Sequence, residues 1–266
     1  MTISLPIFQI DAFAEEPFSG NPAAVVPLDA WLPDDVLQKI AMENNLAETA
    51  FFIPTPDSED TDFHLRWFTP AVEVDLCGHA TLATAAVLFE KLSFAAELVR
   101  FQSKSGILRV RSQGDRFQLD FPVRAATPTR VPDGLADALG GIEPVGFLRA
   151  KKSMAVLASE AEVRAVRPDF AFISRLEGDG LIVTAPGDAV DAASRYFAPH
   201  AGIDEDPVTG SAHCTIVPYW AERLGRTSLH CRQVSARSGD LYCDLADDRV
   251  LMAGAARFYM DGTIHV

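Results

Sequence analysis

Apolar and polar residues alternate along several short stretches of this chain, and two longer stretches are apolar on nearly every side. The short stretches predict strands, at residues 7–13, 23–26, 63–68, 98–101, 106–111, 116–121, 234–236, 240–245 and 250–252. The longer stretches predict helices over residues 80–92 and 211–223. A helix that is apolar all round belongs in the middle of a structure. We therefore expect each of these two helices to be wrapped by a curved sheet.

The two halves of the chain repeat one another. Arg66-Trp-Phe-Thr-Pro70 returns as Arg195-Tyr-Phe-Ala-Pro199, an offset of 129 residues, and Gly78 returns as Gly210, an offset of 132. Ser103-Lys-Ser-Gly106 matches Ala236-Arg-Ser-Gly239 at an offset of 133, which is half of 266. Ordered matches at a nearly constant offset indicate one α/β unit written twice. Residues 122–132, with three prolines, read as a linker between the units.

Composition restricts the class of partner. With 266 residues and 48% apolar residues, the chain is long enough for two modest cores. The formal net charge of −14 argues against nucleic acid or an anionic membrane as the main partner. We find no signal peptide and no membrane span in the sequence, and expect a cytoplasmic protein. The four cysteines are scattered without a C-x-x-C pair, so neither a zinc ribbon nor a disulfide framework is indicated.

Candidate chemistry gathers where loops enter the two apolar helices. In the second half, the acidic run that ends at Asp206 precedes Pro207 and the small residues Gly210, Ser211 and Ala212. Small residues leave the first N–H groups of a helix uncovered, and such groups attract anions. The acidic run reads either as a solvated helix cap or as a proton carrier beside an anion site.

Three residues in the first half are candidates for the same chemistry. Glu48 interrupts an apolar run at the start of a strand, where a carboxylate is either exposed by alternation or buried for a purpose. His79 follows Gly78 at a helix start, where the positive end of the helix dipole favours a neutral imidazole. Asn21 either caps a turn or faces a ligand. The sequence contains no phosphate-binding loop, no H-E-x-x-H and no G-x-S-x-G, and we expect no metal and no cofactor.

Four ordered motifs carry a family resemblance over essentially the whole chain. They are Phe18-Ser-Gly-Asn-Pro22, Asn45-Leu-Ala-Glu-Thr-Ala-Phe51, Cys77-Gly-His-Ala-Thr-Leu82 and Glu205-Asp-Pro-Val-Thr-Gly-Ser-Ala-His213. This set resembles the phenazine-biosynthesis PhzF family. The resemblance implies the α+β diaminopimelate epimerase-like fold, with two pseudo-symmetric domains, each a curved, mainly antiparallel, barrel-like sheet around a central helix. We expect one domain at 1–118 plus about 256–266, the other at 119–255, and the active site in the cleft between them.

The resemblance also implies roles for individual residues. Glu48 matches the family's catalytic Glu, and His79 and Asp206 match its active-site His and Asp. Substrate binding is expected at Asn21 and at the two helix starts, Gly78, Ala80, Gly210, Ser211 and Ala212. The implied function is a cofactor-independent isomerase, a homodimer, that moves a proton on a small carboxylate substrate, of the trans-2,3-dihydro-3-hydroxyanthranilate isomerase type.

Two other functions remain open at this stage. Epimerases and racemases of this fold use two thiols, and Cys77 lies near the place of the first, but the second unit offers Asp206-Pro207 there and Cys214 lies too far into the helix. The other alternative is a metabolite-binding or partner-binding protein with a vestigial site. Such a protein would need the helix starts but not the acid/base residues.

Overall fold

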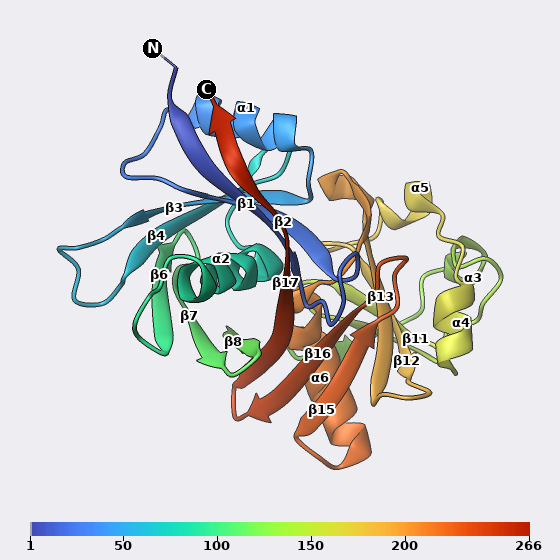
Figure 1. The fold of residues 1–266 in the computed structure, drawn as a ribbon. Coiled ribbons are helices and arrows are strands. Elements are labelled where there is room, and N and C mark those ends of the chain that lie inside the picture. The colour runs from blue at the N-terminus through green and yellow to red at the C-terminus, as the bar shows by residue number, and fades with distance from the viewer. Residues whose placement is uncertain (1) are drawn as a thin grey trace. The chain divides into compact units, whose positions relative to one another are not determined.

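The computed structural model describes residues 2–266 and divides the chain into two compact units. Unit 1 comprises the residues up to Asp120 together with Ala253–Val266, and unit 2 comprises Phe121–Met252. Each unit holds one long, buried helix among strands, α2 in unit 1 and α6 in unit 2 (Figure 1). The long strand β17, Arg249–His265, begins in unit 2 and continues into unit 1.

Unit 1 is a mainly antiparallel sheet with one helix inside it and another outside. Antiparallel pairing joins β1 to β2 and to β17, β3 to β4, and β6 to β7 and on to β8, whereas β2 with β3 and β4 with β6 are parallel. The bounds are β1 Ser4–Ala12, β2 Asn21–Pro27, α1 Asp34–Asn44, β3 Glu48–Pro54, β4 Phe63–Phe68, β5 Glu73–Val74, α2 Gly78–Glu90, β6 Leu98–Ser103, β7 Gly106–Gln113 and β8 Arg116–Pro122.

Helix α2 is enclosed, as its apolar sequence predicts. Its residues from His79 to Leu88 are all buried, and it contacts β1, β2, β3 and β7. Its two threonines satisfy their hydroxyls inside the helix: Thr81 donates to the carbonyl of Cys77 at 2.5 Å and Thr84 to that of Ala80 at 2.7 Å. Polar groups that are hydrogen-bonded cost little to bury, so the helix can be surrounded on every side.

Unit 2 is built on the same plan. Parallel pairing joins β11 to β12 and β13 to β15, and antiparallel pairing joins β9 to β10, β10 to β11, β12 to β13, β13 to β14 and β15 to β16. The bounds are β9 Thr127–Pro128, α3 Leu135–Ala138, β10 Gly146–Arg149, β11 Ser153–Val156, α4 Glu160–Ala165, α5 Phe170–Ile173, β12 Leu181–Pro186, β13 Ala192–Ala198, the 3-10 turn η1 Pro199–Ala201, β14 Ile203–Asp206, α6 Gly210–Leu224, β15 Ser228–Gln233 and β16 Gly239–Ala246. Helix α6 contacts β13, β15 and β16.

The internal repeat extends to individual side-chain contacts. In unit 1, Arg66 Nε lies 2.8 Å from Glu73 Oε1, and in unit 2 Arg195 Nε lies 2.7 Å from Glu205 Oε1. Both pairs join a strand to the short strand that precedes the buried helix, β4 to β5 and β13 to β14. Those helices then begin after Cys77 and Thr209, each with an extended backbone. The two units therefore share their order of elements and the ion pair before the central helix.

One predicted strand is wrong. Residues 234–236 lie outside any strand, with a bend at 235–237, and the strand of this region is β15, which ends at Gln233. The bend is held by side chains: Ser235 donates its hydroxyl to the Pro207 carbonyl at 2.7 Å, and Ser238, at φ 58°, donates its own to the Gln233 carbonyl. Within residues 2–266, no helix has both the length and the apolar character needed to cross a membrane.

Candidate active site

Two polar residues of unit 1 lie at the first positions of neighbouring strands. Asn21 opens β2 and Glu48 opens β3, and these strands run parallel with Ala23 opposite Glu48. Both side chains are buried, with Asn21 at 0% and Glu48 at 8% exposure. Parallel strands that begin side by side deliver their first side chains to one edge of the sheet, so the pairing of β2 with β3 explains why these two residues lie close together.

The start of α2 supplies the imidazole that joins them. His79 Nε2 lies 3.1 Å from Glu48 Oε2, and His79 Nδ1 lies 3.1 Å from the Asn21 side-chain nitrogen. The contact with Glu48 is within ion-pair distance, but Oε2 makes no aligned hydrogen bond among the described residues. A carboxylate oxygen that is buried and not committed to a hydrogen bond is free to accept a proton.

The charge state of His79 differs from the sequence prediction. Burial disfavours the imidazolium, but the Cys77 sulfur and the Glu48 carboxylate raise the pKa of His79 well above its usual value. We attribute the raised pKa mainly to Glu48, because a full negative charge 3.1 Å away outweighs the partial charge of the helix dipole. The helix dipole therefore predicts the wrong direction for the pKa shift of His79, and the imidazolium is the favoured form.

Cys77 completes the cluster as a neutral thiol. Its Sγ lies 3.5 Å from His79 Nδ1. Burial, and next the charge of Glu48, raise the pKa of Cys77 to about 11. Donor atoms of Glu48, Cys77 and His79 lie within 4.8 Å of one another, so the three are the group that could approach a metal ion. Metal binding needs a thiolate and a neutral imidazole, and both residues hold their protons here, so the cluster is better suited to proton transfer.

Gly78 and Ala80 flank His79 in the first turn of α2. Ala80 is fully buried, and Gly78 is the first residue of the helix. N–H groups of a first helical turn have no acceptor inside the helix. The N–H groups of both residues therefore lie in the turn that carries His79, with that of Ala80 directed at the Cys77 sulfur. Their role in substrate binding stays a prediction.

In unit 2, Asp206 is held by the residue that begins the central helix. Thr209 donates its hydroxyl to Asp206 Oδ2 at 2.5 Å. The buried amide of Gln233 then fixes both: its nitrogen donates to the Asp206 carbonyl at 2.6 Å, and its oxygen accepts from the Thr209 N–H at 2.9 Å. Asp206 itself is half-buried at the end of β14. Its carboxylate is thus fixed in position and partly accessible.

The remaining predicted residues of unit 2 form the first turn of α6. Gly210 and Ala212 are buried and Ser211 is half-buried. His213, in the same turn, is committed to the helix backbone: its Nδ1 lies 2.9 Å from the Thr209 carbonyl, and burial lowers the pKa of His213 to about 4. His213 is therefore a neutral packing residue, as its place inside the helix predicts.

The structure brings the candidates together in two groups, each within its own unit. His79 contacts both Asn21 and Glu48, whereas Asp206 contacts Thr209 and Gln233, which the sequence did not single out. For Thr209 a signal existed, because the offset of 132 that relates Gly78 to Gly210 also relates Cys77 to Thr209. Gln233 carried no signal, since its role comes from β15 lying beside α6.

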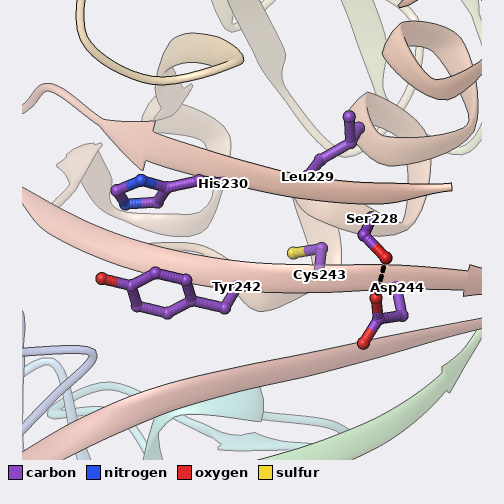
Figure 2. Close-up of a pocket in the computed structure, with 6 residues that line it drawn as sticks. All are labelled: Ser228, Leu229, His230, Tyr242, Cys243 and Asp244. Atoms are coloured by element: carbon purple, nitrogen blue, oxygen red, sulfur yellow. Dashed lines mark hydrogen bonds between the residues drawn. The ribbon is translucent and has the colours of Figure 1, made fainter. Parts of the chain in front are cut away.

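A surface depression in unit 2 lies outside both groups. It encloses about 240 Å³ over β15 and β16 and is lined by Ser228, Leu229, His230, Tyr242, Cys243 and Asp244 (Figure 2). The rings of His230 and Tyr242 stack at 4.5 Å, and Ser228 donates to Asp244 at 2.5 Å. His230 also pairs with Asp240 at 2.6 Å. These polar groups are engaged with one another, and the lining includes none of the predicted site residues.

Comparison with known proteins agrees with the fold and the motifs. A family model described as phenazine biosynthesis-like protein, PhzC-PhzF, matches residues 10–262. An uncharacterized isomerase of Pseudomonas aeruginosa is 52% identical over 264 residues, which cover 99% of this chain and 100% of the relative. The crystal structure of a phenazine biosynthesis protein of the PhzF family from Enterococcus faecalis superposes with a TM-score of 0.95 at 44% identity, covering 99% of this chain and 100% of that one.

More distant structures define the fold class. A hydroxyproline epimerase from Agrobacterium vitis superposes with a TM-score of 0.64 at 10% identity, covering 99% of this chain and 93% of that one, and at this identity the likeness shows the fold alone. Two units, each with a mainly antiparallel sheet around a buried helix, place the chain among α+β proteins of the diaminopimelate epimerase-like fold. Within that fold, the chain belongs to the PhzC-PhzF family of phenazine biosynthesis-like proteins.

Proposed function

We propose that this protein is a cofactor-independent isomerase that moves a proton on a small carboxylate substrate, with Glu48 as the acid/base. The observation that carries the proposal is the buried Glu48 carboxylate, whose Oε2 lies 3.1 Å from the His79 imidazole without an aligned hydrogen bond. The name of the P. aeruginosa relative, an uncharacterized isomerase, agrees with this reaction class.

The reaction balances without any external reagent. Glu48 takes a proton from a C–H bond next to an unsaturated or carboxylated carbon, and the electron pair of that bond shifts into the neighbouring π system. The double bond moves, and the Glu48 carboxylic acid returns the proton to a different carbon. The elemental composition of the substrate is unchanged. His79, as imidazolium, lies 3.1 Å from Glu48 Oε2 and positions the carboxylate for this step.

Binding of the substrate is assigned to backbone donors and to unit 2. The N–H groups near Gly78 and Ala80, and those near Gly210, Ser211 and Ala212, suit a carboxylate or the negative charge of an enolate-like transition state. Asp206 serves the same reaction by holding a polar substituent and steering the proton. A substrate of the trans-2,3-dihydro-3-hydroxyanthranilate type fits this chemistry, and the resemblance further suggests a homodimer.

The decisive experiment measures solvent deuterium incorporation by mass spectrometry. A panel of cyclic and amino carboxylic acids, including trans-2,3-dihydro-3-hydroxyanthranilate, is incubated in D₂O with the wild type, with Glu48→Gln and with Glu43→Gln. Glu43 is an exposed residue of α1 and serves as the matched control. Exchange in the wild type and in Glu43→Gln, together with a loss of at least about a hundredfold in Glu48→Gln, is the expected result.

Two outcomes would contradict the proposal. Exchange that persists in Glu48→Gln would remove Glu48 from the mechanism. Tight binding of a panel member without any exchange in the wild type would favour the alternative of a binding protein with a vestigial site.

A further inference from the structure

Unit 2 buries a lysine. Lys152, directly before β11, is only 7% exposed and is the one buried lysine or arginine among residues 2–266. Its neighbour Lys151 behaves in the ordinary way, with a side chain 61% exposed and Nζ 3.0 Å from Asp179 Oδ2. Lysine is almost never fully buried unless its charge is paired, so Lys152 calls for an explanation.

Among residues 2–266, no carboxylate lies within ion-pair distance of the Lys152 ammonium. Its Nζ lies 4.9 Å from the centre of the Tyr196 ring, a cation–π contact, and it makes no hydrogen bond or ion pair with any residue from 2 to 266. A buried ammonium without an acceptor is costly. Burial, as the main cause, lowers the pKa of Lys152, while the charges of Asp179 and Asp206 act in the opposite direction.

The charge of a second cation, Arg124, acts on Lys152. The positive charge of Arg124 further disfavours the charged form of Lys152, and both cations act on the thiol of Cys214 in α6. Arg124 is tied to this helix because its backbone N–H donates to the Cys214 carbonyl at 2.9 Å. Within the described chain, its guanidinium has no hydrogen-bond or ion-pair partner. Lys152 and Arg124 repel each other and have no acceptor among residues 2–266, although the protein has a net charge of −14. A bound anion would compensate both charges.

The buried lysine is connected to Asp206 through Tyr196. Tyr196 stands opposite Asp206 in the pairing of β13 with β14, and its ring carries the Lys152 contact. The ring is held in place because its hydroxyl donates to the Asp179 carbonyl. Gly180, at φ +112°, leaves room for it, since a Cβ there would lie 2.9 Å from the Tyr196 hydroxyl. The ammonium is therefore positioned next to the Asp206 part of the candidate site rather than free on the surface.

We propose that Lys152, assisted by the charge of Arg124, binds the carboxylate of the substrate and selects acidic substrates over neutral ones, which leaves the N–H groups of the helix starts for the negative charge of the enolate-like transition state. The assignment of the anion as substrate rests on the proposed function, whereas the anion site itself rests on the contacts of Lys152 and Arg124. A charge-assisted hydrogen bond from a buried ammonium discriminates strongly between a carboxylate and a neutral amide of the same shape, because the amide leaves the charge uncompensated.

The test is calorimetric titration of the full chain with benzoate, cyclohexanecarboxylate and glutarate, beside benzamide and inorganic phosphate. The proteins are the wild type, Lys152→Met, Lys152→Arg, Arg124→Met and the control Lys151→Met. We expect carboxylate affinity to fall by about tenfold or more in Lys152→Met, less in Arg124→Met, and to be partly retained in Lys152→Arg. Lys151→Met should match the wild type, and benzamide should bind more weakly than benzoate.

Thermal unfolding separates a ligand-binding lysine from a structural one. Removing an uncompensated buried charge should leave the unfolding temperature of Lys152→Met equal to or above that of the wild type. Unchanged carboxylate affinity in Lys152→Met would overturn the proposal, as would the absence of carboxylate binding by the wild type. Phosphate binding with the same Lys152 dependence, and no carboxylate binding, would identify an inorganic-anion site and overturn the assignment to substrate.

The deuterium exchange of Glu48→Gln distinguishes the two levels of the argument. If Glu48→Gln still exchanges protons while Lys152→Met loses carboxylate binding, the isomerase mechanism fails and the anion site stands. If Glu48→Gln loses exchange while Lys152→Met binds and turns over like the wild type, the mechanism stands and the anion site fails.

Discussion

The hydroxyl of Thr209 donates a 2.5 Å hydrogen bond to Oδ2 of Asp206. Thr209 occupies in unit 2 the place that Cys77 occupies in unit 1, the residue directly before the central helix. The two units therefore present different chemistry at matching positions: a thiol in contact with an imidazole, and a hydroxyl bound to a carboxylate. This arrangement does not offer the two equivalent thiols that a two-thiol reaction needs. It offers two chemically different groups, as a reaction with one acid/base residue would require.

Thr209→Val should reduce the proton-transfer rate, because Asp206 loses the hydrogen bond that fixes its carboxylate. A hydrogen bond to a charged group contributes about 1.5–3 kcal/mol, so we expect a rate loss of about tenfold to a hundredfold. Thr209→Ser, which keeps the hydroxyl, is the matched control and should recover most of the rate. Steady-state kinetics with pH profiles of both variants check this, and equal losses in Val and Ser would show that shape rather than the hydroxyl matters.

His79 should make stability depend on pH in the alkaline direction. The folded state holds the His79 proton more tightly than the unfolded chain, whose histidine pKa is about 6.5. Its contribution is therefore complete below about pH 6.5 and is lost as pH rises through the higher folded pKa. Urea unfolding at pH 6, 7.5 and 9 should show the stability gap between wild type and His79→Gln shrinking with pH. The exposed His200→Gln is the control, and its gap should stay constant.

His213 should act in the opposite, acidic direction. Burial lowers the pKa of His213 to about 4, below the value of about 6.5 in the unfolded chain. The contribution of the neutral ring is present above pH 6.5 and is lost as pH falls towards 4, in total about 3 kcal/mol. His213→Asn, which keeps a donor for the Thr209 carbonyl, should lose less stability between pH 7 and pH 4.5 than the wild type does. Parallel acid slopes for the two proteins would rule out this role.

Cys77 should be dispensable for the chemistry. A thiol whose pKa is raised to about 11 is protonated at neutral pH and is a poor base. Cys77→Ala is expected to keep proton exchange within the same order of magnitude and to lose about 1 kcal/mol of stability from the cavity. In the native wild type, iodoacetamide should leave Cys77 unmodified at pH 8. An exchange rate that falls by about a hundredfold in Cys77→Ala would instead indicate a thiol base.

Short motifs made much of the first group predictable. Asn21, Glu48 and His79 each lie at the start of an element, and the apolar runs beside them mark those elements clearly. The repeat offset located the second helix, which begins at Gly210, one residue before the predicted start. The helix of unit 1 begins at Gly78, directly after the extended residue Cys77 and two residues earlier than predicted.

Residues whose roles arise from long-range pairing could not be predicted. Lys152 lies between a lysine and a serine, and nothing local marks it as buried. Its side chain contacts the Tyr196 ring, which lies 44 positions further along the chain. The protonated state of His79 was missed for a similar reason, since the Glu48 charge that controls it comes from a different element. The bend at residues 235–237 depends on the Pro207 carbonyl, which is 28 positions from Ser235.

Strand β17 has a consequence for the order in which the protein acquires its shape during synthesis. Unit 2 is one continuous segment, Phe121–Met252, so it is synthesised without interruption by residues of unit 1. Unit 1 lacks Ala253–Val266 until later, and β1 pairs with this part of β17 from Ser4 opposite His265 to Ala12 opposite Ala256. Synthesis of the unit that holds Glu48 and His79 therefore begins first and ends last. The sheet around the proposed catalytic base is complete only after the C-terminal part of β17 has been made.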